Sequence, residues 1–185
     1  MVKEPRPGRV KTRLGRDVGM TGAAWWFRRQ SAALLQRLDD PRWRLVLAVT
    51  PDREGLQSRV WPAHLARVPQ GRGDLGARMA RLLRRLSPGP VCIVGADIPA
   101  LGKPHVARAF AALGDHDAVF GPAVDGGFWL VGMKRVAAPP ATLFRGVRWS
   151  TPHALFDSMT SMGGQRIALV DTLRDVDSAA DLDPL

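Results

Sequence analysis

The sequence predicts an α/β fold, in which helices cover both faces of a mostly parallel sheet. Two observations support this prediction. Short apolar runs alternate with amphipathic stretches of helical period, and the clearest run, Val91–Val94, leads directly into the loop Gly95–Pro99. In open α/β sheets, ligands bind in the loops that follow the carboxyl ends of strands. Loops in this position are therefore the first places to look for function.

Apolar periodicity assigns the elements in chain order. A helix is predicted from Thr21, as its N-cap, to about Leu38, and its inner face consists of Phe27, Leu34, Leu35 and Leu38. Further helices are predicted at residues 74–86, 103–113 and 151–162. Strands are predicted at residues 45–49, 65–68, 91–94, 117–120, 128–133 and 167–170. The inner face of the 74–86 helix is predicted to be Leu75, Met79, Leu82, Leu83 and Leu86.

Composition narrows the class of protein. The 185 residues are 45% hydrophobic and 24% charged, which predicts one folded domain over residues 1–185. No apolar run is long enough to cross a bilayer and no signal-peptide pattern opens the chain, so we expect a cytoplasmic protein without a membrane partner. The formal charge of +10 comes from basic residues spread along the whole chain, and the aromatic residues do not interleave with them. This pattern disfavours nucleic acid as a partner and favours a small polyanionic ligand.

The segment from Lys3 to Leu14 has the character of a phosphate-binding loop. Gly8 lets the backbone turn sharply and approach a ligand, and Lys11 and Arg13 follow at a spacing that can place two cations beside a diphosphate. Such a loop normally follows a buried strand, for which only Met1 and Val2 remain here. We therefore expect an N-terminally truncated domain that lacks most of its first strand, with the true start codon upstream.

Two aspartates stand in loops that are suited to chemistry. Asp97 directly follows a strand, where a carboxylate can bind a Mg²⁺ or Mn²⁺ ion that bridges two phosphates; the alternative is a cap of a turn or helix. Asp125 precedes Gly126 and Gly127, which leave room for an acceptor to approach the backbone. It is a candidate general base or hydroxyl ligand, and the alternative is an ordinary Asp-Gly hairpin turn.

Two further motifs carry weaker signals. Asp175 and Asp177 lie two residues apart, so in an extended segment one metal ion could contact both. Spacing alone favours the alternative, in which they form a solvated acidic end with Asp181 and Asp183, and Asp177 or Ser178 caps a helix. The glycine-rich turn around Gly73, Asp74 and Gly76 opens a helix, where free backbone N–H groups favour an anion or a base edge. Asp74 as an N-cap explains much of the same pattern.

Six motifs in order suggest a family. They are Lys3–Leu14, Gly73–Met79, Gly95–Pro99, Gly121–Phe128, Trp149–Thr151 and Asp175–Leu182. Together they resemble the GT-A-like transferases known as rSAM/selenodomain-associated glycosyltransferases. That group is similar in turn to nucleotidyltransferases such as 2-phospho-lactate guanylyltransferase and the molybdenum-cofactor guanylyltransferase. The resemblance covers essentially the whole chain and implies a nucleotide-diphospho-sugar transferase fold.

The resemblance also implies roles for single residues. Lys11 and Arg13 would bind phosphates, the Gly73–Gly76 turn would approach the nucleotide, Asp97 and Asp177 would bind Mg²⁺ or Mn²⁺, and Asp125 would face the acceptor. The chain departs from the family in having Phe128 in place of a tyrosine, a single carboxylate in Gly95–Pro99, and Ser178-Ala-Ala-Asp-Leu182 where related nucleotidyltransferases have Thr-Pro-Glu-Asp-Leu.

Of three functions, the sequence favours the first and leaves the other two open as alternatives. The first is metal-dependent glycosyl transfer from a nucleotide-diphospho-sugar to a small-molecule acceptor. The second is nucleotidyl transfer from an NTP to a phosphorylated acceptor, which needs cations but no base, because a phosphate nucleophile is already ionised. The third is a non-catalytic nucleotide-binding module.

Overall fold

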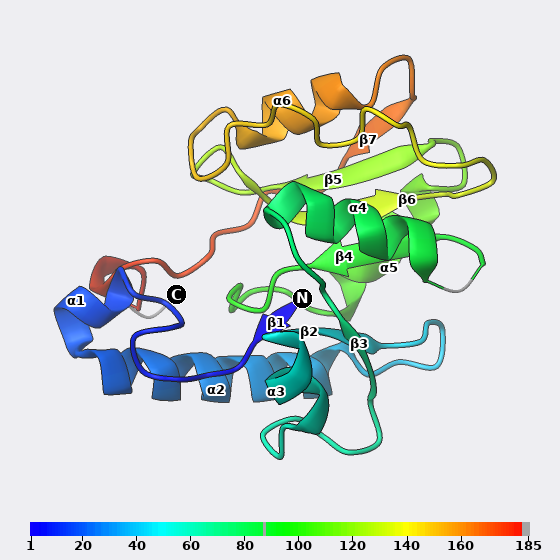
Figure 1. The fold of residues 1–185 in the computed structure, drawn as a ribbon. Coiled ribbons are helices and arrows are strands. Elements are labelled where there is room, and N and C mark those ends of the chain that lie inside the picture. Colours follow the sequence, from blue (N-terminus) through cyan, green and yellow to red (C-terminus); the bar gives the residue numbers. More distant parts are fainter. Residues whose placement is uncertain (87, 183–185) are drawn as a thin grey trace. The chain divides into compact units, whose positions relative to one another are not determined.

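The strands of the protein pair into two sheets, as seen in a computed structural model that describes residues 1–86 and 88–182 (Figure 1). The first sheet is parallel throughout and has the order β1-β2-β3. Its strands are β1 (Val2–Lys3), β2 (Val46–Thr50) and β3 (Ala66–Pro69). The predicted strands at 45–49 and 65–68 are therefore confirmed, each displaced by one residue.

The second sheet has the order β4-β6-β5-β7. Its strands are β4 (Val91–Val94), β5 (Ala118–Pro122), β6 (Phe128–Met133) and β7 (Ile167–Leu169). Strand β6 runs antiparallel to both of its neighbours, whereas β5 and β7 are parallel. With parallel strand pairs and helices between the strands, the α/β class predicted from the sequence is confirmed.

The chain divides into two compact units, each built from segments that are separate in the sequence. Unit 1 contains Met1–Gln70, Gly95–Lys103 and the described part of Asp175–Leu185; unit 2 contains Gly71–Val94 and Pro104–Arg174. The first sheet therefore belongs to unit 1 and the second sheet to unit 2. Among the described residues, no helix is both long enough and apolar enough to span a membrane.

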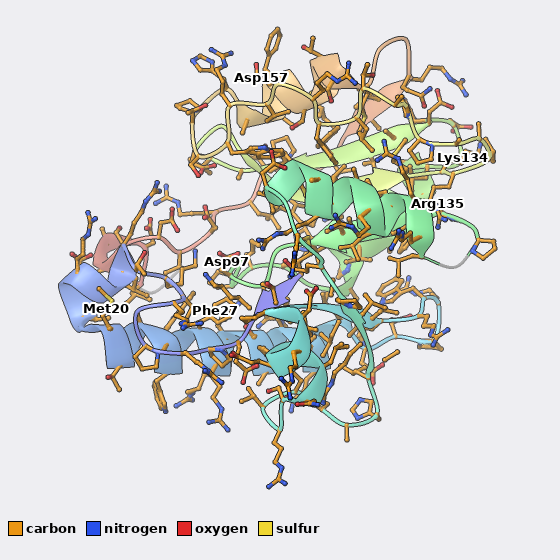
Figure 2. The ribbon with its side chains drawn as sticks, in the orientation of Figure 1. Met20, Phe27, Asp97, Lys134, Arg135 and Asp157 are labelled. Atoms are coloured by element: carbon orange, nitrogen blue, oxygen red, sulfur yellow. The ribbon has the colours of Figure 1, made fainter. Side chains whose placement is uncertain are left out.

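Unit 1 contains one long helix, α2 (Met20–Leu38), and three short ones. These are α1 (Leu14–Val18), α3 (Asp52–Gln57) and the 3₁₀ turn η1 (Ala179–Leu182). The predicted inner face of α2 is confirmed, because Phe27 (Figure 2), Leu34, Leu35 and Leu38 are all buried. The predicted N-cap is wrong. Gly19, with a φ of 80°, precedes the helix, so Thr21 lies inside the first turn and caps nothing.

Strand β1 is short but tightly held. Val2 and Lys3 pair with Val49 and Thr50 of β2, and Val2 is buried. The buried side chain of Gln70 donates hydrogen bonds to the carbonyl oxygens of Val2 and Ala48, at 3.0 and 2.9 Å. Buried carbonyls need partners, and Gln70, which directly follows β3, supplies them for β1 and β2. It thereby links the carboxyl ends of the three strands, where the Lys3–Leu14 loop begins.

Unit 2 contains α4 (Leu75–Arg85), most of α5 (Lys103–Ala112) and α6 (Ala154–Ser161). Asp74 caps α4, and its carboxylate accepts a hydrogen bond from the Ala77 N–H at 2.7 Å. Met79, Leu82 and Leu83 are buried as predicted. Leu75 is 47% exposed, so its predicted place on the inner face is wrong. Gly76, the next residue, takes the buried position at this end of the helix.

Candidate functional site

The loop after β1 makes a tight turn and then places Lys11. The Arg9 N–H donates to the Arg6 carbonyl at 3.0 Å, and Gly8 has a φ of 72°, as its predicted role in a sharp turn requires. Val10 is buried and anchors the loop. Lys11 has a φ of 44°, in the left-handed region that residues with a Cβ atom rarely adopt.

Two basic and three acidic side chains converge beyond this loop. The Lys11 ammonium lies 2.5 Å from Asp97 Oδ2, 2.8 Å from Asp177 Oδ1 and 4.0 Å from Asp175 Oδ2. The Arg13 guanidinium bonds the other oxygen of Asp177 at 2.9 Å. We call these five residues the Lys11 cluster. All five belong to unit 1, although Asp97 (Figure 2) and the Asp175–Asp177 segment come from distant parts of the sequence.

A small apolar core holds the acidic segment in place. Val176 is 2% exposed and packs with Leu14 and Ala23, and Trp26 and Ala179 border this cluster. The Val176 N–H also donates to the Asp97 carbonyl at 3.2 Å, which ties the two acidic segments together. Because successive residues of an extended segment point to opposite sides, burying Val176 turns Asp175 and Asp177 the other way, toward Lys11.

Asp181 serves the local structure of this segment. Its Oδ2 accepts hydrogen bonds from the Asp177 N–H at 3.1 Å and from the Ser178 N–H and hydroxyl, both at 2.8 Å. This is one half of a capping box, in which the third residue of a turn bonds back to the capping residue. Ser178 therefore precedes η1 as its cap, and the Asp177 carboxylate remains directed at Lys11. Asp183 lies outside the described residues.

The charges in the cluster reinforce one another. Burial lowers the pKa of Lys11, whose side chain is 9% exposed, but Asp97 and Asp177 outweigh that effect and raise it overall. For Asp177, burial raises the pKa of the carboxyl, but hydrogen bonding and charge from Lys11, with a contribution from Arg13, outweigh it and lower the value. Lys11 therefore stays protonated and Asp177 ionised at neutral pH.

The donor set of the cluster fits a hard divalent cation. Mg²⁺ and Mn²⁺ prefer carboxylate oxygens, and Mg²⁺ usually takes one or two carboxylates together with phosphate oxygens and water. Asp97 and Asp177 supply two such carboxylates, already directed at one positive charge. Among residues 1–86 and 88–182, no group of three or more His, Cys, Asp or Glu side chains is arranged to hold a metal ion by itself. The two carboxylates would therefore need ligands from phosphate and water.

The glycine-rich turn before α4 belongs to unit 2. Gly73 has a φ of 105°, and Arg78 donates to its carbonyl oxygen at 2.9 Å. A Cβ atom on Gly76 would lie 2.7 Å from the Trp149 ring and 2.8 Å from Phe144 Cβ. The missing side chain of Gly76 thus has a structural reason, which is close packing against two aromatic residues.

Asp125 is exposed and lies in the turn between β5 and β6. Its Oδ1 accepts a hydrogen bond from the Gly127 N–H at 2.9 Å, so the carboxylate stabilises its own turn. Gly126 has a φ of 84°, and its carbonyl accepts from the Leu155 N–H at 3.1 Å. The turn is thereby fixed against the beginning of α6.

The segment Trp149–Pro152 contacts both glycine motifs of unit 2. Trp149 packs on Gly76, and Pro152 packs on Gly126. The same indole forms an aromatic group with Phe128 and Phe144, at ring-centroid distances of 6.2 and 5.9 Å. Trp149 belongs to one of the six motifs that carry the resemblance, but the sequence has no signal for these contacts, which join residues far apart in the chain.

An ion pair next to this segment leads to a prediction about acid stability. Hydrogen bonds from Arg148 to Asp157 of α6 (Figure 2) lower the pKa of that carboxyl from 3.8 to about 2. A lowered folded-state pKa gives stability that is present above pH 3.8 and is lost as the pH falls through about 2. Asp157→Asn should therefore have a lower urea midpoint than the parent at pH 6, and the gap should close between pH 4 and 2.

The exposed carboxylate of Asp115, in the same unit, provides the control for that measurement. Asp115→Asn should track the parent over the whole pH range. A gap for Asp157→Asn that is the same at pH 6 and pH 2.5 would contradict the assigned role of the Arg148 pair.

The predicted site residues thus fall into two groups. The structure brings together Lys11, Arg13, Asp97 and Asp177 in unit 1, where Gly8 shapes the same loop. Gly73, Asp74, Gly76 and Asp125 lie in unit 2. Val176 and Asp181, which orient the acidic segment, were not predicted as positioning residues. The signal that could have identified Val176 is an apolar residue between two aspartates, which indicates an extended segment with one buried side.

Comparison with known proteins establishes the family. The model of the family described as "Uncharacterized protein conserved in bacteria (DUF2064)" matches residues 33–151, which is more than half of the chain. The chain belongs to the DUF2064 family. No curated protein matches it in sequence.

Solved structures confirm the fold of this DUF2064 member. A proposed nucleotide-diphospho-sugar transferase from Desulfovibrio desulfuricans G20 is 30% identical, with a TM-score of 0.87 over 98% of this chain and 81% of that one. The 4-diphosphocytidyl-2C-methyl-D-erythritol synthase from Anaerococcus prevotii DSM 20548 has a TM-score of 0.57 at 11% identity, over 84% and 82% of the two chains. Rv0371c from Mycobacterium tuberculosis H37Rv has a TM-score of 0.52 at 12% identity, over 84% and 80%. The DUF2064 chain therefore has a nucleotide-diphospho-sugar transferase-like fold, as the resemblance in its motifs implied.

Proposed function

We propose that this protein is a metal-dependent glycosyltransferase that uses a nucleotide-diphospho-sugar donor and a small-molecule acceptor. The observation that carries the proposal is the Lys11 cluster, in which two basic and three acidic side chains meet beyond the loop that follows β1. The loops after parallel strands are where α/β folds bind ligands. The 30% identity to a proposed nucleotide-diphospho-sugar transferase supports a donor of this class.

The cluster supplies what a departing diphosphate needs. When the bond from the sugar to the diphosphate breaks, negative charge grows on the diphosphate, and Lys11 and Arg13 are the cations that stabilise it. Asp97 and Asp177 would hold Mg²⁺ or Mn²⁺, which supplies further positive charge to the phosphate oxygens when bound. Gly8 leaves the loop backbone open for a close approach, since nothing lies within 4 Å of a Cβ atom built there.

Residues of unit 2 take the remaining roles in this proposal. The turn from Gly73 through Asp74 to Gly76 is assigned to the nucleotide, because helix starts offer backbone N–H groups to anions. Asp125 is assigned the acceptor: its carboxylate takes the proton of the hydroxyl whose oxygen forms the new bond to the sugar. Its exposure leaves it open to an incoming acceptor.

One observation favours a second function, nucleotidyl transfer to a phosphorylated acceptor. Asp125 Oδ1 is hydrogen-bonded within its own turn, which is sufficient reason for an aspartate at this position. A phosphate acceptor is already ionised and requires no base, so nucleotidyl transfer would use the Lys11 cluster and leave Asp125 as a turn residue.

Calorimetric binding in the presence of Mn²⁺ tests the proposal. UDP-sugars and GDP-sugars are compared with free NTPs on the parent protein, on Asp97→Ala and on Asp39→Ala, which removes an exposed carboxylate of the same unit. We expect one nucleotide-sugar to bind best, and Asp97→Ala to weaken that binding by about 100-fold or more, equivalent to about 2.7 kcal/mol. Asp39→Ala should bind like the parent.

The other outcomes are equally informative. Tighter binding of an NTP than of any nucleotide-sugar would favour nucleotidyl transfer. Nucleotide-sugar binding that is unaffected by Asp97→Ala or by removal of Mn²⁺ would contradict the assigned metal site. Failure of every nucleotide to bind would contradict both candidate functions.

A further inference from the structure

We propose that the Lys11 ammonium occupies the cation position between Asp97 and Asp177, so that a divalent ion and Lys11 compete for the same carboxylates. A diphosphate would resolve this competition by giving Lys11 another anionic partner. Metal ion and diphosphate would then bind cooperatively, and Lys11 would add to the coupling that direct contact between metal and phosphate provides. This inference rests on the proposed function, because it concerns the metal and diphosphate of that same site.

The distances support direct competition. The ammonium nitrogen is 2.5 Å from one carboxylate and 2.8 Å from the other, and the two carboxylates come from separate segments of the chain. Metal–oxygen bonds to Mg²⁺ are about 2.0–2.1 Å long, so an ion bound by both Asp97 and Asp177 would overlap the ammonium. The two charges would also repel each other strongly at such a separation.

The environment of Lys11 holds its side chain in this place. The side chain is 9% exposed, whereas that of Arg13 is 64% exposed and contacts only one of the two carboxylates within the cluster. The φ of 44° at Lys11 costs about 1–2 kcal/mol for a residue with a Cβ atom, and such a conformation persists when surrounding contacts enforce it. Lys11, and not Arg13, is therefore the side chain that a metal ion must displace.

This competition predicts a measurable coupling between metal binding and diphosphate binding. A metal ion that binds alone must break the ion pairs of Lys11 with Asp97 and Asp177. The buried ammonium would then keep only the more distant Asp175 carboxylate of the Lys11 cluster, 4.0 Å away, which is costly. When a diphosphate is present, its oxygens accept the ammonium and Asp97 and Asp177 become available. By reciprocity, the diphosphate must strengthen metal binding by the same factor as the metal strengthens diphosphate binding.

The test measures Mn²⁺ binding from the electron paramagnetic resonance signal of free Mn²⁺, with and without inorganic pyrophosphate. Pyrophosphate supplies the diphosphate without assuming a base, and a titration without protein corrects for Mn²⁺–pyrophosphate complexes in the buffer. The proteins are the parent, Lys11→Met, Lys11→Gln, and the control Lys103→Met. Lys103 belongs to the same unit, its side chain is 44% exposed, and it lies 3.7 Å from Asp40. Circular dichroism checks that each variant is folded.

We expect Lys11→Met and Lys11→Gln to bind Mn²⁺ alone about 10-fold more tightly than the parent. Pyrophosphate should tighten Mn²⁺ binding to the parent by a factor about 10-fold larger than for the Lys11 variants, in which only direct contact between metal and phosphate couples the two ligands. Lys103→Met should behave like the parent. Should both Lys11 variants fail to fold, the parent still decides, because a coupling factor below about 2 overturns the inference.

Equal Mn²⁺ affinity of the parent and the folded Lys11 variants would overturn the inference and leave the proposed function standing. Mn²⁺ binding by the variants, with none by the parent under any condition, would support Lys11 as the resident cation while contradicting the metal dependence of the proposed function. No Mn²⁺ binding by any protein would overturn both.

Discussion

Replacing Asp125 with asparagine is expected to lower kcat for glycosyl transfer by about 10²–10⁴-fold, the usual contribution of a general base. The amide keeps an oxygen that can accept the Gly127 N–H, so the turn between β5 and β6 should survive. The nucleotide-sugar should therefore bind to Asp125→Asn with the affinity of the parent. The measurement combines initial rates at saturating acceptor with calorimetry of the donor.

The same variant separates the two candidate reactions. A loss of rate with donor binding intact supports an acceptor hydroxyl that Asp125 deprotonates. Turnover close to that of the parent would favour nucleotidyl transfer, in which no base is needed. Asp115→Asn, another exposed carboxylate of unit 2, should leave the rate unchanged and serves as the control.

Gly126→Ala is expected to destabilise the protein by about 3 kcal/mol or more, through two effects that act together. The φ of 84° is unfavourable for alanine, and the added Cβ atom would clash with the backbone of Pro152. The Pro152 backbone cannot move away easily, because the neighbouring Leu155 N–H is bonded to the Gly126 carbonyl. Urea unfolding of the variant and the parent measures the difference.

Gly146→Ala provides the matched control for this steric effect. Gly146 lies in the same unit and has a φ of 72°, but nothing lies within 4 Å of a Cβ atom built on it. It should cost only the backbone term, about 1–2 kcal/mol. Equal destabilisation by the two substitutions would show that the contact between Gly126 and Pro152 contributes nothing.

Much of the fold could be predicted because its signals are local. The apolar residues on the inner face of α2 recur with helical spacing, and Val91–Val94 forms a short apolar run before a loop. The error at Thr21 has a local cause as well. A threonine caps a helix only where the chain enters the helix, and Gly19, with its positive φ, sets that point two residues earlier. Propensity alone could not locate the entry.

The site could be predicted in part, because loop position and residue type are visible in a sequence but partners are not. The spacing of Asp175 and Asp177 correctly indicated two carboxylates on one side of an extended segment. Nothing local indicates that Asp177 meets Lys11, since 166 residues separate them. The packing of Gly76 against Phe144 and Trp149 was hidden for the same reason, as it depends on residues about seventy positions away.

Unit 1 is built from three separate segments of the chain, Met1–Gln70, Gly95–Lys103 and the described part of Asp175–Leu185. During synthesis these segments emerge from the ribosome one after another. A nascent chain that has emerged only as far as Arg174 already contains the Lys3–Leu14 loop and Asp97, but it has neither Asp177 to pair with Lys11 nor Val176 to pack on Leu14. Closing so long a loop carries an entropic cost that later contacts must offset. The Lys3–Leu14 loop therefore gains these partners only after the segment that begins at Asp175 has emerged.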